Sequence, residues 1–278
     1  MAGRAVQGGP EAGSERRARG RALLALALLV PVPTLGALAG MVWLPGTRVG
    51  AGLFAFAKVW ILALPLAWHV AVDRAPLSLS PARRGGFGMA VGSGIAISLV
   101  ILAVFAGWGG RLIDAAILRE RVAAMGLGDP MRYALAALYW TLVNALLEEY
   151  VWRWFVVRKC AILLRSSCAA IAASAAFFTL HHLFALRVYF GTTAVAVAGA
   201  GVFLGGVIWS WMYLRYRSIW PGYVSHAIVD LCLFALGAHL LFFAAEHKRP
   251  VRSGVGAAIS ALERPQGSCP EELDKGGG

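Results

Sequence analysis

The chain has 278 residues, of which 59% are hydrophobic and only 14% are charged, and its formal net charge at pH 7 is +12. Soluble domains carry roughly a quarter charged residues, so this composition excludes an ordinary soluble enzyme of the same size. Long apolar runs recur along the chain and are typical of membrane-spanning helices. The sequence therefore predicts an all-α, polytopic transmembrane helix bundle.

The positive charge is not arranged as a nucleic-acid-binding face. Lysine and arginine residues form short clusters between the apolar runs, and an excess of basic residues on the cytoplasmic side is the usual signal of membrane topology. The clusters lie at 16–21, 83–84, 158–159, 215–217 and 248–252. We therefore expect the lipid bilayer, and no nucleic acid, as a partner, with the N-terminus on the cytoplasmic side. The four cysteines include no CxxC pair and predict no disulfide framework.

The apolar runs define the expected spans. Residues 1–20 are polar and rich in glycine and arginine, and we expect a disordered basic tail there. The apolar run that follows continues to about Trp43, which favours a retained first span over a cleaved secretion signal. Seven runs are near the roughly 20 residues that cross the hydrocarbon core. They are 22–44, 51–72, 86–108, 133–157, 168–186, 192–214 and 219–245. Seven spans from a cytoplasmic N-terminus put the C-terminal basic cluster outside, and one further span would put it inside. We therefore expect about seven to eight spans.

The connection at residues 109–132 is the one long interruption between spans. Its apolar residues alternate with charges at helical spacing, which predicts one interfacial amphipathic helix that is ended by a Gly-Asp-Pro sequence. The chain then divides into four parts. They are a disordered tail at 1–20, N-terminal transmembrane helices with the amphipathic connection at 21–132, a transmembrane core with the candidate catalytic residues at 133–247, and a flexible C-terminal tail at 248–278.

Six ionisable side chains within the predicted spans indicate a site. A charged group at mid-bilayer costs about 2.5–3.5 kcal/mol on insertion scales, so such groups are functional candidates. A lone buried polar residue often only joins two helices, but six of them on three spans favour a common site. The pairs Glu149–Arg153 and His226–Asp230 are each four residues apart and share a helix face. The six residues are Glu148, Glu149, Arg153, His181, His226 and Asp230.

These residue types support the activation of water. A carboxylate and a histidine that both reach one water can deprotonate it and later deliver the proton to a leaving group. A second histidine with a neighbouring donor can stabilise the oxyanion of a tetrahedral intermediate. Hydrolysis of a peptide bond within the membrane fits these parts, so we expect a membrane-associated protein or peptide as substrate.

The order and spacing of these residues resemble the CPBP family of intramembrane proteases. This family includes the type II CAAX prenyl endopeptidases and ABI-like proteins of bacteriocin processing and self-immunity. It is marked by EExxxR, FxxxH and HxxxN motifs in separate transmembrane helices. In this chain the motifs read EEYVWR (148–153), FFTLH (177–181) and HAIVD (226–230). The resemblance covers roughly 133–245 and implies an intramembrane endopeptidase.

The resemblance also implies a role for the first two motifs. Glu148 would activate the water together with His181. Glu149 and Arg153 would orient and support the site. His182 also satisfies the FxxxH spacing, and we prefer His181 because it also matches the longer SxxFxxxH pattern.

For the third motif, the resemblance implies that His226 and residue 230 stabilise the oxyanion. The chain has an aspartate where the pattern has asparagine. An amide donates a hydrogen bond and an ionised carboxylate does not. Asp230 is therefore either protonated or orients His226.

The sequence leaves open whether a metal takes part. Glu148, His181 and His226 could hold Zn²⁺, which takes nitrogen and oxygen ligands and keeps one position open for water. Glutamate-dependent catalysis without a metal fits the same residues. We favour no cofactor, with zinc as the alternative.

Signals of other intramembrane proteases are absent or misplaced. The sequence has no HExxH motif, the GLGD sequence at 126–129 lies in a connection, and VGSGIA at 91–96 lacks the first glycine of a GxSG motif. Two other classes stay open: a small transporter with a buried polar relay, and a non-catalytic immunity or scaffold protein of the same fold. We expect a multi-pass protein of a bacterial inner, cytoplasmic membrane.

Overall fold

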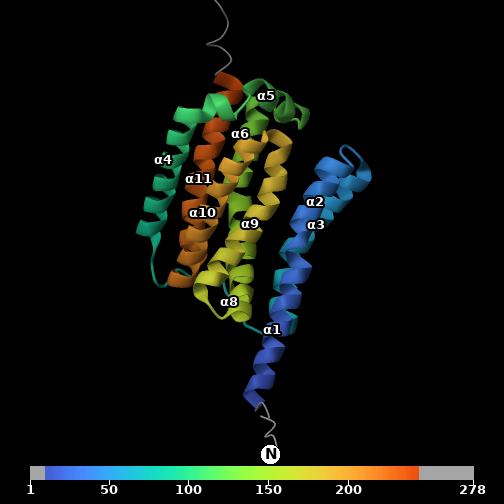
Figure 1. Cartoon of the computed structure of the whole chain (residues 1–278), viewed down its shortest axis with the longest axis vertical. Coiled ribbons are helices and arrows are strands. Elements are labelled where there is room, and N and C mark those ends of the chain that lie inside the picture. The colour runs from blue at the N-terminus through green and yellow to red at the C-terminus, as the bar shows by residue number, and fades with distance from the viewer. Residues whose placement is uncertain (1–9, 244–278) are drawn as a thin grey trace, which may run out of the picture.

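The computed structural model describes residues 10–243, and every regular element in this range is helical. Figure 1 shows the long helices running side by side as an elongated bundle, with the helical hairpin of α1 to α3 on one side. The α-helices are α1 (Pro10–Leu29), α2 (Pro31–Leu38), α3 (Arg48–Ala67), α4 (Phe87–Leu112), α5 (Ala115–Ala124), α6 (Pro130–Leu138), α7 (Ala145–Glu148), α8 (Arg158–Leu164), α9 (Ser167–Tyr189), α10 (Thr192–Tyr216) and α11 (Trp220–Ala238). Wider π-helical segments continue several of them at Ala39–Trp43 (η1), Trp68–Val72 (η2), Tyr139–Asn144 (η3), Glu149–Val157 (η4) and His239–Phe243 (η5).

Six helical stretches in the described range are long and apolar enough to cross a membrane, by length and composition. They are Gly13–Trp43, Arg48–Val72, Phe87–Leu112, Ser167–Tyr189, Thr192–Tyr216 and Trp220–Phe243. The predicted polytopic helix bundle is confirmed. The remaining predicted span, 133–157, lies inside one continuous helical stretch from α6 to α8, but it is not among the six. This stretch holds three of the candidate ionisable residues, which lower its hydropathy.

The N-terminal segment differs from the prediction. Helix α1 begins at Pro10, so disorder was the wrong expectation for residues 10–20. Alanine and arginine favour helix, and α1 packs on α8, beyond which the Arg165 guanidinium lies 2.8 Å from the Glu15 carboxylate. Residues 1–9 and the predicted flexible tail at 248–278 lie outside the described residues.

A short helix occupies the predicted amphipathic connection. Helix α5 lies across one end of the bundle (Figure 1). It begins after Asp114, whose carboxylate accepts hydrogen bonds from two backbone amides of the first turn. Leu118 and Val122 are buried against Leu241 at the end of the last helix. The structure therefore contains a helix within the connection, as predicted. Its location at the membrane interface stays a prediction.

The stretch from α6 to α8 lies in the middle of the bundle and carries most of the core. It contacts α9, α10 and α11, while α4 packs on α11 and α3 contacts η4. Trp152, Val156 and Phe178 are almost fully buried in the largest apolar cluster. Any ionisable group on the inner face of η4 is therefore held among packed side chains.

Local signals explain where this central stretch begins and ends. The Asp129 carboxylate accepts a hydrogen bond from the backbone amide of Arg132 at 3.0 Å, and Pro130 takes the first helical position. Arg165 ends the stretch with φ of 58°, in the left-handed region. The two π-helical segments η3 and η4 flank Glu148, and such segments are frequent at functional sites.

Candidate active site

A fully buried carboxylate forms the centre of the site. Glu149 has no exposed surface, and its Oε1 lies 3.1 Å from Nδ1 of His226 and 3.5 Å from Nη1 of Arg153. The carboxylate accepts, so Nδ1 of His226 carries the proton of that hydrogen bond. Glu149 thereby joins the central stretch to α11.

Arg153 supplies the positive charge next to this carboxylate. Its guanidinium is fully buried and makes no hydrogen bond within the described residues. It lies over two aromatic rings, 4.4 Å from the centre of Phe178 and 5.1 Å from that of Trp209. Cation–π attraction therefore holds the guanidinium beside Glu149 and supplements the ion pair.

The imidazole of His226 is held by a stacked indole and by the bond to Glu149. It stacks on Trp209 with ring centres 4.0 Å apart and 16° between the planes. The Trp209 indole donates to the Ser225 hydroxyl at 3.0 Å, and that hydroxyl lies 3.0 Å from the hydroxyl of Ser93 on α4. Together with the bond to Glu149, these contacts determine where Nε2 of His226 points.

A glycine makes room for the buried carboxylate. A Cβ atom at Gly222 would lie 2.6 Å from Oε2 of Glu149, closer than real contacts of this kind. Residue 222 lies in the first turn of α11, one turn before His226. Glycine at this position lets α11 approach the central stretch closely enough for the Glu149–His226 bond to form.

Glu148 differs from its neighbour in its surroundings. The Glu148 side chain is 17% exposed, whereas that of Glu149 is fully buried, so Glu148 is the more accessible of the two carboxylates. The Asn144 side-chain amide donates to Oε1 of Glu148 at 2.9 Å. Oε2 of Glu148 lies 3.7 Å from Nε2 of His226. The two glutamates thus face different sides of the same histidine.

The two histidines of α9 lie next to Glu148. One ligand atom from each of Glu148, His181 and His182 falls within 4.8 Å of the other two. His182 donates from Nδ1 to the Phe178 carbonyl at 2.8 Å, which leaves Nε2 as the acceptor nitrogen. His181 stacks on Trp152 with ring centres 5.1 Å apart and nearly parallel planes. Both histidines are therefore placed to act with Glu148.

This grouping bears on the metal question. The expected ligand set was Glu148, His181 and His226, but the structure groups Glu148 and His181 with His182. His226 is not in this group, and its Nε2 lies 3.7 Å from both Glu148 and Asp230. Two imidazole nitrogens and one carboxylate oxygen are the donor types that zinc takes in catalytic sites, so the α9 histidines with Glu148 fit that ion.

Asp230 approaches Nε2 of His226 to the same distance as Glu148 does. Its Oδ1 is 3.7 Å from Nε2 of His226, which is longer than a hydrogen bond. The close carboxylate partner of His226 is Glu149, at Nδ1. Glu149 therefore orients the His226 ring at Nδ1, and the role of Asp230 stays a prediction.

Two polar residues near Glu148 were not predicted. Asn144 lies four residues before Glu148 on the same stretch, so its spacing within a span could have indicated it. Lys58 of α3 interacts electrostatically with both Glu148 and His181. Lys58 lies within the predicted span 51–72, and an ionisable residue inside a span could have indicated it as a site residue.

The six predicted site residues fall within one matched region. Residues 130–232 match the family model for type II CAAX prenyl endopeptidase Rce1-like proteins. The matched family agrees with the family that the three motifs resemble. The match covers less than half of the chain, and it leaves out α1 to α5. Comparisons with curated proteins and with solved structures found no match. The Rce1-like family is a protease family, and the apolar helices make the chain an integral, multi-pass membrane protein.

Proposed function

We propose that this chain is an intramembrane endopeptidase in which Glu148, with a histidine of α9, activates water for hydrolysis of a peptide bond. The observation that carries the proposal is the place of Glu148, the more exposed of two adjacent glutamates, between the α9 histidines and His226. The match to a protease family supports it.

Glu148 is the general base and acid of the proposed reaction. It takes a proton from water while the water oxygen bonds to the peptide carbonyl carbon. It then gives this proton to the leaving nitrogen as the carbon–nitrogen bond breaks, which yields a carboxylic acid and an amine. The Asn144 amide holds the carboxylate in place, and a histidine of α9 accepts a hydrogen bond from the same water through its free nitrogen.

His226 is the proposed donor to the oxyanion. Its Nδ1–H is engaged by Glu149, so it donates from Nε2 when both ring nitrogens carry protons. Glu149 and Arg153 are positioning residues in this proposal, because they fix the ring through Nδ1 and do not face the water. Asp230 takes no step in this proposal, because its Oδ1 lies 3.7 Å from Nε2 of His226, which is beyond hydrogen-bond distance.

The proposed reaction uses no metal. If zinc is the cofactor, Glu148, His181 and His182 would hold it, and the ion would lower the pKa of a bound water. The roles of Glu149, Arg153 and the Asn144 amide would be unchanged, because none of them belongs to that ligand set.

The proposed substrate is a membrane-associated protein or peptide, and the proposed location is a bacterial cytoplasmic membrane. Membrane fractions of cells with wild-type chain and with Glu148→Gln can be compared by proteomics. A precursor that accumulates only with Glu148→Gln supports the proposal. The matched control is Glu120→Gln, which changes an exposed glutamate on α5. Identical precursors in all three strains would favour a scaffold or transporter and contradict proteolysis.

A further inference from the structure

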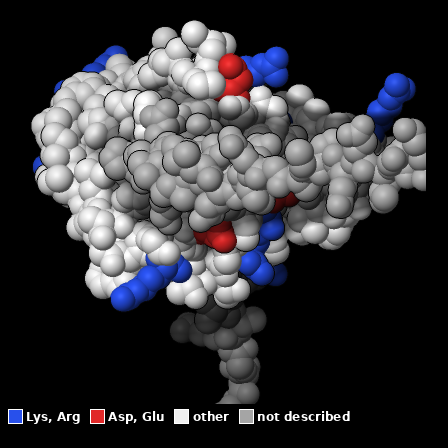
Figure 2. Space-filling view, turned by 90° about the horizontal axis from the view of Figure 1, so that it is seen from above, with Lys and Arg blue, Asp and Glu red and all other residues white. Residues whose placement is uncertain are grey.

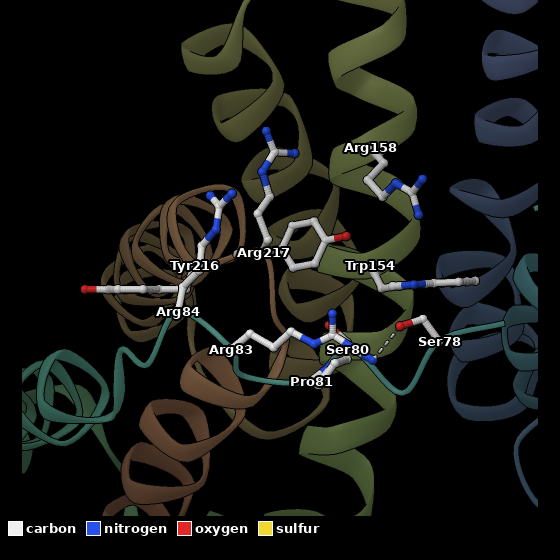
Figure 3. A pocket seen from close by; sticks show the side chains of 10 residues that line it. Ser78, Ser80, Pro81, Arg83, Arg84, Trp154, Arg158, Tyr216 and Arg217 are labelled. Carbon is white, nitrogen blue, oxygen red and sulfur yellow. Dashed lines mark hydrogen bonds between the residues drawn. The ribbon is translucent and has the colours of Figure 1, made fainter. Parts of the chain in front are cut away.

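A basic cavity lies at the end of the bundle opposite to α5, away from the candidate active site. It has a volume of about 370 Å³ and is lined by four arginines, Arg83, Arg84, Arg158 and Arg217, together with other side chains. Figure 3 shows these arginine side chains around the hollow, with the Trp154 indole at its wall. They come from the connection before α4, from α8 and from the residue after α10.

The connection that carries Arg83 and Arg84 is fixed to the start of α11. Ser80 is buried, with φ of 54°, and its hydroxyl accepts a hydrogen bond from the Ile219 amide at 3.0 Å. The buried Ser218 hydroxyl donates to the Ser80 carbonyl at 2.7 Å. These reciprocal bonds hold the connection against the turn between α10 and α11, and so keep the arginines of both segments close together.

A second contact fixes the same connection to α10. Gly86 has φ of 101°, and a Cβ atom there would lie 2.8 Å from the Tyr216 ring. Arg217 follows this tyrosine in the left-handed region, with φ of 54°, and its amide donates to the Tyr213 carbonyl at 2.8 Å. The backbone on both sides of the cavity is therefore constrained.

The four arginines have no acidic partners in the part of the chain that the structure describes. All four are exposed, and none lies in an ion pair. Basic residues close by do have partners, since Lys159 pairs with Asp73 at 2.5 Å and Arg165 with Glu15. Four unpaired positive charges around one cavity repel one another, so an anion between them is favourable. Arginine forks match phosphate oxygens in geometry.

The position of the cavity indicates where the anion comes from. Its lining belongs to the basic connections that the sequence predicts on the cytoplasmic side, where membrane leaflets carry anionic lipids. At the other end of the bundle, the visible Lys and Arg side chains are scattered around the rim, some of them beside acidic side chains (Figure 2). Basic pockets between transmembrane helices on the cytoplasmic side suit lipid head groups.

We propose that the cavity lined by Arg83, Arg84, Arg158 and Arg217 binds the phosphate of an anionic phospholipid head group. This site is separate from Glu148 and His226 and does not depend on the proposed proteolysis. Arg158 follows Glu149 by nine residues, more than two turns of helix. The Trp154 indole, which is mostly buried, adds an apolar wall to the cavity.

Native mass spectrometry of the full chain in detergent tests this proposal with two probes, phosphatidylglycerol and phosphatidylcholine. The wild type is expected to bind one phosphatidylglycerol in preference to phosphatidylcholine. Each basic residue near an anionic lipid surface strengthens binding by about fivefold. The double variant Arg158→Gln/Arg217→Gln should therefore weaken the binding of phosphatidylglycerol by about 30-fold. Arg83→Gln/Arg84→Gln, on the other wall, should have a similar effect.

The control is Arg111→Gln/Arg121→Gln, which removes the same charge from exposed positions outside the cavity lining and should leave the affinity unchanged. Equal affinity of the wild type and both cavity variants for phosphatidylglycerol would overturn the proposal, as would equal binding of the two lipids. A third arm adds inorganic phosphate. If it binds the cavity as tightly as the lipid, the ligand is a free phosphate and the lipid assignment is wrong.

Discussion

Replacing Gly222 by alanine tests how the buried carboxylate of Glu149 is held. The new Cβ would lie 2.6 Å from Oε2 of Glu149, whereas ordinary contacts begin at 3.4 Å, so the carboxylate has to move by about 0.8 Å. Oε1 of the same carboxylate lies 3.1 Å from Nδ1 of His226, so we expect the shift to lengthen or misalign that hydrogen bond. Misplacement of a catalytic group by about 1 Å can lower the rate about 100-fold.

Two measurements separate the expected effects of Gly222→Ala. Cleavage of the precursor should fall by about 10- to 100-fold, and the free energy of unfolding should fall by about 1–3 kcal/mol because the core is overpacked. The control is Gly201→Ala on α10, where a Cβ meets nothing within 4 Å. Normal cleavage and unchanged thermal unfolding of Gly222→Ala would refute the described contact between α11 and Glu149.

Three further predictions concern the surroundings of Glu148 and His226. Asn144→Ala removes the hydrogen bond to Glu148 and should lower precursor cleavage by about 10-fold without loss of folded protein; unchanged cleavage would show that the amide does not hold the carboxylate. Asp230→Asn should keep cleavage within about threefold of wild type, since this carboxylate lies 3.7 Å from the ring; a large loss in the same assay would restore Asp230 to the mechanism. The purified chain should contain less than about a tenth of an equivalent of zinc and stay active with a chelator; stoichiometric zinc with loss of cleavage on chelation would establish a metalloprotease.

The membrane-spanning helices could be predicted because the length of an apolar run can be read directly from the sequence. Four spans predicted from apolar runs, 51–72, 86–108, 168–186 and 192–214, begin and end within four residues of the helical stretches found. The start of α1 could not be predicted in this way. Residues 10–20 are polar, and Glu15 among them lies next to Arg165, which is far away in the sequence.

The sequence could predict the contacts of the site only between residues of the same helix. The pair Glu149–Arg153 follows from a spacing of four residues on one helix. The same spacing directed attention to Asp230 as the partner of His226, but the close partner is Glu149 on another helix. No spacing indicates that contact, because it depends on how closely α11 approaches at Gly222.

The central claim is that Glu148 activates water for peptide hydrolysis. The most direct test is to reconstitute the purified chain in liposomes with the precursor that accumulates in Glu148→Gln cells. The wild type should produce one new N-terminus at a single position, and Glu148→Gln should produce none although it unfolds at the same temperature. Equal product formation by both proteins, or no product with the wild type, would contradict the account.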